Sequence, residues 1–150
     1  MEGPGTGGSP CTSCRVGSVD MWRKAADAAA GCGADAIIAA DIAVLDHVAR
    51  NHRQIRLHLS VQAAAATPEA IGFYVETFGV RRVVLPRVLS IQEVATLNRD
   101  IRVETEAFVF GGLCVMTEGR CYLSSYATGK SPNLNGVCSP PEMVSYEEDI

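Results

Sequence analysis

Between residues 21 and 110, segments with strand periodicity alternate with segments of helical periodicity, and this alternation restricts the possible folds most strongly. The expected strands are 34–41, 55–62, 81–87 and 102–110, and the expected helices are 21–31, 42–51, 68–79 and 90–98. Single helices between successive strands require parallel strands, because each right-handed crossover carries a helix across the sheet. The sequence therefore predicts an α/β fold of βα units.

The ends of the expected helices carry recognisable capping residues. Thr67 stands directly before Pro68, which suits an N-cap followed by proline at the first helical position. Ser90 and Glu93 have the spacing of a capping box. Within 42–51 the residues expected on the buried helical face are Ile42, Leu45, Val48 and Ala49.

The chain length bears on the architecture. Four βα units suit either a doubly wound sheet or part of a (β/α)8 TIM-like barrel, and composition does not separate the two. A full barrel typically needs about 250 residues, so the 150 residues here predict a partial barrel, apparently a fragment of a longer protein. Residues 1–20 are rich in glycine and proline, so they are expected to be a disordered leader before a βα domain over 21–150.

Charge and hydropathy restrict the environment and the partners. The formal net charge of -4 gives no electrostatic support for nucleic-acid binding, so nucleic acid is not expected as a partner. No apolar run has the roughly 18 residues that a membrane span needs. The first 20 residues lack the basic start and apolar core of a signal peptide. These features predict a cytoplasmic protein whose six cysteines are reduced, buried or metal-bound.

The segment 111–142 breaks the βα pattern and contains three cysteines, Cys114, Cys121 and Cys138. They follow the fourth expected strand at its carboxyl end, where parallel α/β folds build ligand sites. Structural zinc sites favour closely spaced cysteine pairs, whereas iron–sulfur clusters accept wider spacings such as this one. The spacing alone leaves metal ligation and simple burial evenly balanced.

The other cysteines have simpler interpretations. Cys32, beside an alanine-rich helix, is expected to be a small buried hydrophobic residue. Cys11 and Cys14 form a C-x2-C pair that could indicate zinc or redox chemistry. Without a second pair or a βα context, we expect this pair to be incidental.

Three polar residues near strand ends are candidates for binding a substrate. Gln62 would end an alternating strand whose polar face also carries His58 and Ser60, although a capped polar face explains the pattern equally well. Arg87 follows the third expected strand and could bind a carboxylate through two parallel hydrogen bonds, or could be a solvated surface residue. Glu106 would need a partner such as Arg87 if it points inward.

The chain lacks the usual hydrolase and nucleotide-binding motifs, and no catalytic residue can be assigned. A peptidase would have candidate Cys or Ser nucleophiles in the loop but no positioned histidine base. His47 and His52, on or just after an expected helix, are predicted to lie at the surface.

The cysteine-bearing segment FVFGGLCVMTEGRCYLSSYATGKSPNLNGVCSP resembles the signature segment of the U32 peptidase-like family. The upstream segments LHLSVQAAAAT and RRVVLPRVLSIQEV resemble the same family in the same order. Within the family, the resemblance is greatest to U subunits of the oxygen-independent ubiquinone hydroxylation system. It extends from about residue 20 to about residue 142.

This resemblance implies a barrel-like domain and a [4Fe-4S] cluster bound by Cys114, Cys121 and Cys138, with the fourth ligand beyond the end of these 150 residues. It also implies a heterodimer with a homologous V subunit. The pair would hydroxylate a ubiquinone precursor without O2, possibly with prephenate as oxygen donor. The alternatives within the family are a U32-type, collagenase-like peptidase and a relative that hydroxylates tRNA or rRNA bases.

Overall fold

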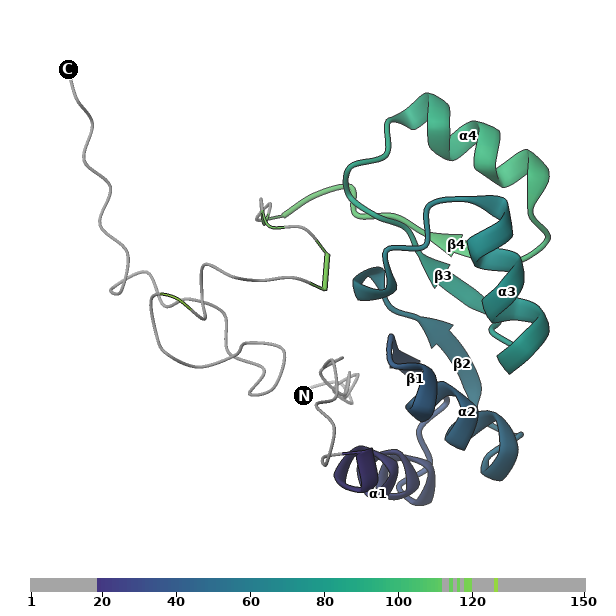
Figure 1. The fold of residues 1–150 in the computed structure, drawn as a ribbon, viewed down its shortest axis with the longest axis vertical. Helices are drawn as coiled ribbons and strands as arrows, with labels where there is room; N and C mark the ends of the chain where they lie inside the picture. The colour runs from purple at the N-terminus through teal and green to yellow at the C-terminus, as the bar shows by residue number, and fades with distance from the viewer. Residues whose placement is uncertain (1–18, 112–113, 115, 117, 120–125, 127–150) are drawn as a thin grey trace, which may run out of the picture.

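Strands and helices alternate along the chain, as the sequence predicts (Figure 1). The computed structural model describes residues 19–111, 114, 116, 118, 119 and 126. The elements are α1 (Val19–Gly31), β1 (Ala36–Ala39), α2 (Ile42–Asn51), β2 (Arg56–Leu59), the 3-10 helix η1 (Val61–Ala63), α3 (Pro68–Phe78), β3 (Arg82–Val84), α4 (Ile91–Asp100) and β4 (Glu104–Glu106). Residues 1–18 of the expected leader and most of the cysteine-bearing loop lie outside the described residues, whereas Val19 and Asp20, also expected to be disordered, begin α1.

The four strands form one parallel sheet in the order β1-β2-β3-β4. In the register, Ile38, His58, Arg82 and Glu104 lie in one row across it. A doubly wound sheet reverses its strand order at a switch point, and the described strands contain no such reversal. The α/β prediction is confirmed, and the strand order is consistent with part of a (β/α)8 barrel.

The hydrophobic core lies between the sheet and the helices. Alternate residues of β2 and the β3 segment, Leu57, Leu59, Val83 and Leu85, are at most 3% exposed. They belong to the same core cluster as the apolar face of α2 and residues of α3 and α4, namely Leu45, Val48, Ile71, Phe78 and Leu97. The helices thus cover one face of the sheet. Because the strands are parallel, their carboxyl ends all lie at the same edge.

The other face of the sheet carries a charged network. Glu104 Oε2 accepts hydrogen bonds from Nη2 of both Arg56 and Arg82, each at 2.9 Å. Arg82 Nη1 also lies 3.4 Å from Glu106 Oε2. His58 lies in the same row as Arg82, and burial, followed by the nearby Arg82 and Arg56 charges, lowers its pKa. We therefore expect a neutral His58 imidazole at pH 7.

All four expected strands are shorter in the structure, and at β2 and β4 the difference affects candidate residues. β2 ends at Leu59 because the Ser60 hydroxyl accepts a hydrogen bond from the Gln62 N–H at 3.2 Å and starts η1. His58, Ser60 and Gln62 therefore do not share the face of one strand. β4 ends at Glu106, and the apolar residues expected to extend it are largely exposed: Phe108, Val109 and Phe110.

The capping predictions are confirmed, whereas two burial predictions are wrong. Thr67 Oγ1 accepts from the Ala70 N–H at 3.2 Å, and Ser90 and Glu93 form the capping box. Ile42 is 52% exposed because the buried face of α2 consists of Val44, Leu45 and Val48. Cys32 is also exposed, since it lies in the turn that ends α1.

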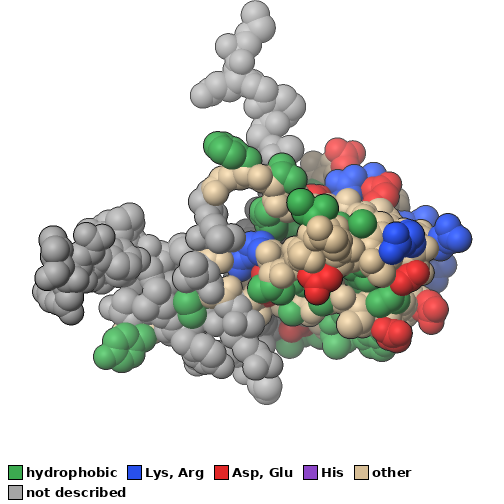
Figure 2. All heavy atoms as spheres, turned by 90° about the horizontal axis from the view of Figure 1, so that it is seen from above, with side chains coloured by type: hydrophobic (Ala, Val, Ile, Leu, Met, Phe, Trp, Pro, Cys, Tyr) green, Lys and Arg blue, Asp and Glu red, His purple; other side chains and the backbone are tan. Residues whose placement is uncertain are grey.

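Within the part of the chain that the structure describes, no helix is both long and apolar enough to cross a membrane. Acidic and basic side chains are interspersed on the surface seen in Figure 2.

The core position of Leu59 gives a test of this packing. Leu59 is fully buried, so Leu59→Ala should lower the free energy of unfolding by about 3 kcal/mol through lost burial and a residual cavity. The matched control is Val88→Ala, which should change it by less than about 0.5 kcal/mol because Val88 is 78% exposed. Urea unfolding followed by circular dichroism measures both, and equal effects would contradict the assigned core.

Candidate functional site

The carboxyl ends of β2 and β3 bring two of the predicted site residues to the same edge of the sheet. η1, which contains Gln62, directly follows β2, and Arg87 follows β3 after Pro86. Parallel strands point their carboxyl ends in one direction, so side chains from successive loops converge there. Contacts from the cysteine-bearing segment show that this edge is where that segment is attached.

An ion pair between Arg87 and Glu118 attaches the segment. Glu118 Oε1 accepts from Arg87 Nε at 3.1 Å and from the Arg87 backbone N–H at 3.0 Å. Arg87 Nη2 also donates to the Met116 carbonyl at 3.1 Å. The two charged side chains are only 19% and 5% exposed, respectively. Arg87 is therefore not a solvated surface residue, and its guanidinium positions Met116 and Glu118.

Glu118 stays ionised although it is buried. Burial opposes its ionisation, but hydrogen bonds from its own backbone N–H and that of Arg87, together with the guanidinium, hold the pKa of Glu118 below its usual value. The carboxylate can therefore neutralise Arg87 at physiological pH. A charged pair at this depth is stable only when its remaining hydrogen bonds are made, as they are here.

The Cys114 thiol lies exposed beside this ion pair. The Met116 backbone N–H and then the Arg87 side chain donate to the sulfur and lower the pKa of Cys114, outweighing its partial burial. A lowered pKa favours the thiolate, which is the form that binds soft metals and iron–sulfur clusters. N–H donors to the sulfur are also typical of cluster ligands, so Cys114 fits the chemistry of a ligand. Cys121 and Cys138 lie outside the described residues.

Gly119 packs directly on Gln62. Its φ is +72°, and a Cβ atom at this position would lie 2.7 Å from the Gln62 carbonyl oxygen. Only glycine meets both conditions without displacing the backbone. The Gln62 side-chain Oε1 is buried and has no hydrogen-bond partner among the described residues. A buried acceptor of this kind requires a donor, and a bound molecule or water could supply it.

The predicted site residues are only partly brought together. Gln62 and Arg87 both contact the segment 114–119, whereas Glu106 pairs with Arg82 instead of Arg87 and is half exposed. Glu118 was missed because a single acidic residue in a glycine-rich loop carries no periodic pattern. The signal that could have found it is Arg87 itself, since a buried guanidinium requires a carboxylate partner.

The fold and these contacts define a class of protein: a parallel βα-unit protein with a cysteine-bearing loop fixed by an ion pair at the strand ends. The family model of peptidase family U32 matches residues 12–148. The chain therefore belongs to the U32 peptidase family.

Several curated relatives align with the chain. It is 40% identical over 106 residues to tRNA hydroxylation protein P of Haemophilus influenzae, an alignment that covers 70% of this chain and 23% of the relative. It is 33% identical over 132 residues to a collagenase of Porphyromonas gingivalis, covering 81% and 31%. It is 34% identical over 114 residues to the 23S rRNA 5-hydroxycytidine C2501 synthase of Escherichia coli, covering 76% and 17%.

The chain thus spans less than a third of the length of each of these relatives. No solved structure matches it. The family is established by these alignments, and the family includes proteins named for RNA hydroxylation and for proteolysis.

The Arg87–Glu118 pair can be tested by neutralising one partner. Glu118→Gln should lower the free energy of unfolding by about 1–3 kcal/mol, because a buried guanidinium loses its counter-charge. Glu76→Gln is the control, since Glu76 is exposed on α3. Thermal and urea unfolding measure both variants, and a Glu118→Gln effect no larger than that of the control would show that the pair does not hold the segment.

The same pair predicts a pH dependence. The pKa of Glu118 is lower in the folded chain than its ordinary value of about 4.3. Its contribution to stability is therefore complete above about pH 4.3 and is lost as the pH falls through the folded pKa. Unfolding measured from pH 6 to pH 3 should show a steeper loss of stability for the wild type than for Glu118→Gln. Parallel curves would contradict the assignment.

Proposed function

We propose that this chain is part of an RNA-base hydroxylation protein of the U32 family, with an iron–sulfur cluster at the carboxyl ends of its strands. The observation that carries the proposal is the position of Cys114 beside the Arg87–Glu118 pair at the strand ends, where the Arg87 side chain helps to lower the pKa of its thiol. The names of the relatives support RNA as the substrate class, because two of the three are named for hydroxylation of tRNA or rRNA.

The cluster is proposed to be [4Fe-4S], with Cys114, Cys121 and Cys138 as ligands and a fourth ligand outside the 150 residues. A bound cluster would supply one-electron chemistry at the edge of the sheet. The chain's own residues would prepare the site. Arg87 favours the Cys114 thiolate and holds the backbone at Met116, and Glu118 keeps the guanidinium in place.

An arginine-lined groove also favours an RNA substrate. A groove of about 910 Å³ lies where the chain enters β2, β3 and β4, and Arg53, Arg56, Arg81 and Arg102 line it. Arg56 is paired with Glu104, and the other three are exposed and carry no ion pair among the described residues. The overall charge of -4 gave no support for a polyanion, but this end of the sheet is locally basic. Arginines in such a groove can neutralise phosphates.

A second candidate is oxygen-independent hydroxylation of a ubiquinone precursor in a heterodimer with a homologous V subunit, with prephenate as a possible oxygen donor. It rests on the resemblance of the cysteine-bearing segment and of the two upstream segments to U subunits. It uses the same cluster and the same role of Arg87, so the site favours neither substrate over the other. The arginine-lined groove lies at the opposite end of the strands from this site, so it supports RNA binding by the chain but does not place the substrate at the cluster.

A peptidase is supported less well. The family's name and the collagenase relative favour it, but a cysteine nucleophile needs an adjacent base. Among the described residues, the groups that donate to the Cys114 thiol are the Met116 N–H and the Arg87 guanidinium, and neither accepts a proton at neutral pH.

Cysteine substitutions test the cluster. In the full-length protein, Cys114→Ala, Cys121→Ala and Cys138→Ala should each abolish bound iron and sulfide and the broad absorbance near 400 nm. Cys32→Ala is the control and should keep the cluster, because Cys32 lies in the turn after α1. Iron and sulfide are measured after anaerobic purification, and unchanged iron in all three loop variants would sink the assignment.

The substrate can be decided in cells that lack the gene. Reintroducing the full-length wild type should restore nucleosides carrying one extra oxygen atom in tRNA or rRNA, as detected by mass spectrometry. Restored ubiquinone under anaerobic growth, with unchanged RNA, would instead support the second candidate. Proteolysis that survives iron removal would support the peptidase.

Arg87→Lys should reduce this hydroxylation, because one ammonium group cannot bind Glu118, the Met116 carbonyl and the Cys114 sulfur together. Arg99→Lys is the control, since Arg99 is exposed and its side chain bonds only Thr96 among the described residues. Full activity of Arg87→Lys with an intact cluster would show that Arg87 has no role in the reaction.

A further inference from the structure

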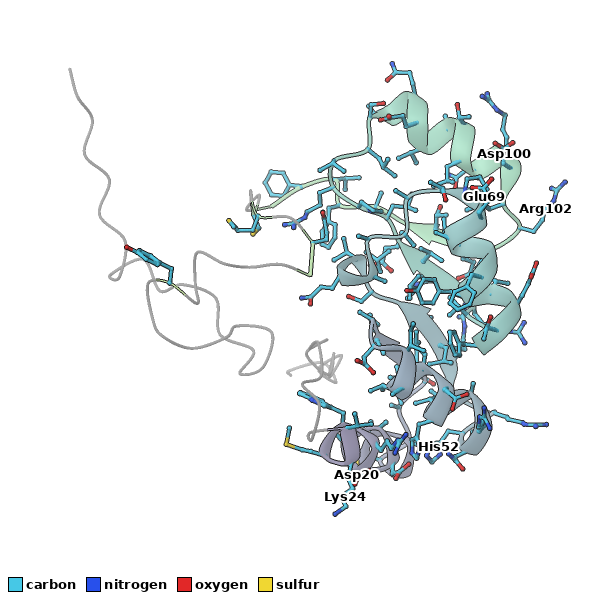
Figure 3. All side chains as sticks on the ribbon, in the orientation of Figure 1. Asp20, Lys24, His52, Glu69, Asp100 and Arg102 are labelled. Carbon is cyan, nitrogen blue, oxygen red and sulfur yellow. The ribbon has the colours of Figure 1, made fainter. Side chains whose placement is uncertain are left out.

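Three potential metal ligands meet between α1 and α2, away from the cysteine-bearing segment. Asp27 comes from α1, His47 from α2, and His52 is the residue that caps α2. The Nε2 atoms of His47 and His52 each lie 2.6 Å from the same Asp27 Oδ1 atom. Figure 3 labels His52, which lies close to α1. The two imidazoles are each 18% exposed, so both lie near the surface as expected but are largely covered.

The backbone holds these ligands in place. α1 and α2 pack against each other, and Ala26 of α1 and Val48 of α2, each next to a ligand in sequence, belong to the buried core. The His52 N–H bonds the Val48 carbonyl at 2.8 Å, and its carbonyl accepts from the Ile55 N–H at 2.9 Å. The ligands therefore sit on a rigid frame, as a preorganised site requires.

The arrangement also has the geometry of a ligand set. Both contacts are 2.6 Å long, close to the range of about 2.7–2.9 Å for charge-assisted hydrogen bonds, and they share one oxygen atom. Two imidazole nitrogens facing one carboxylate oxygen is the arrangement expected of ligands that surround a common cation. The ligand atoms of all three residues lie within 4.8 Å of one another.

We propose that Asp27, His47 and His52 form a binding site for a divalent transition-metal ion such as Zn²⁺, Co²⁺ or Ni²⁺. Zinc bonds to histidine nitrogen and carboxylate oxygen are about 2.0–2.2 Å long, which places tetrahedral ligands roughly 3.3 Å apart. Each Asp27–imidazole contact, now 2.6 Å long, reaches this spacing by lengthening by less than about 1 Å. The two imidazole nitrogens, which lie within 4.8 Å of each other, need to approach by at most about 1.5 Å. Imidazole ligands suit these borderline ions, whereas calcium and magnesium prefer sites made of oxygen ligands.

The surroundings fit a site that can exchange its ion. The Asp27 side chain is 48% exposed, so a fourth position remains open to water. His52 also lines the arginine-lined groove, which gives solvent access from that side. The ligands are nitrogen and oxygen atoms of the helical layer, so this site is chemically and spatially separate from the proposed thiolate cluster and does not rest on it.

Asn51 supplies a partner for the outer nitrogen of His47. Its Nδ2 lies 3.2 Å from His47 Nδ1 and 2.8 Å from the His47 carbonyl. Metal at Nε2 requires a proton on Nδ1, so Asn51 must then turn its amide and present its oxygen instead. Because a carboxylate partner raises the basicity of a metal-bound histidine, Asn51→Asp should bind the ion more tightly.

The experiment measures Ni²⁺ binding by equilibrium dialysis of the metal-stripped full chain with all thiols alkylated, so that cysteines cannot bind the ion. The wild type should bind one equivalent at this site. His47→Gln, His52→Gln and Asp27→Asn should each weaken binding by at least about tenfold, since the loss of an outer partner alone commonly costs 10–100-fold. Asp46→Asn is the matched control: Asp46 is also on α2 and is paired only with Arg50 among the described residues.

Thermal unfolding with and without Ni²⁺ separates a metal site from a hydrogen-bonded clamp. A metal site predicts that Ni²⁺ raises the melting temperature of the wild type and of Asp46→Asn but not of the three ligand variants, since an ion that binds only the folded state stabilises it. Circular dichroism identifies any variant that fails to fold, and Asn51→Asp, which retains all three ligands, then provides the independent test. Two results would overturn the proposal. One is that the ligand variants melt lower than the wild type by the same amount with and without Ni²⁺. The other is that Ni²⁺ binding is unchanged in the three ligand variants and in Asn51→Asp.

Discussion

The rest of the structure depends on the apolar layer between the parallel sheet and its helices. Residues at alternate positions of β2 and β3, including Leu59 and Val83, are fully buried against α2, α3 and α4. Because a strand turns successive side chains to opposite faces, this layer forces the charged residues Arg56, Arg82 and Glu104 onto the other face. It also fixes the strand direction, so that the loops after β2 and β3 open at the same edge of the sheet.

The candidate site lies at this edge, at the carboxyl ends of β2 and β3. Arg87 lies just past β3 with its side chain only 19% exposed, and Glu118 supplies its counter-charge from 31 residues further along the chain. This long-range ion pair brings the Cys114 thiol to the strand ends. Gly119 completes the attachment, since its missing side chain lets the segment approach the Gln62 backbone.

The sequence predicts those features that depend on local patterns. Helix starts at Thr67 and Ser90 were predicted because their caps use residues within three positions, and the parallel sheet follows from alternating periodicities. Strand ends were less predictable, because Ser60 can continue a strand or begin a 3-10 turn with the same residue pattern. Contacts such as Arg87–Glu118 and Asp27–His52 could not be predicted, since they join residues at least 25 positions apart whose types have no shared periodicity.

The Arg87–Glu118 pair and the Asp27–His47–His52 cluster differ in how far burial requires a partner. Arg87 is buried by the loop it holds, so its charge partner is a structural necessity and its contact with Cys114 is an added consequence. Asp27, by contrast, is half exposed and could be solvated by water without any partner. Two histidines nevertheless converge on one of its oxygens and join α1 to α2. Two imidazoles and a carboxylate at one point also match the ligands of a transition-metal ion, which is why a metal site is proposed there.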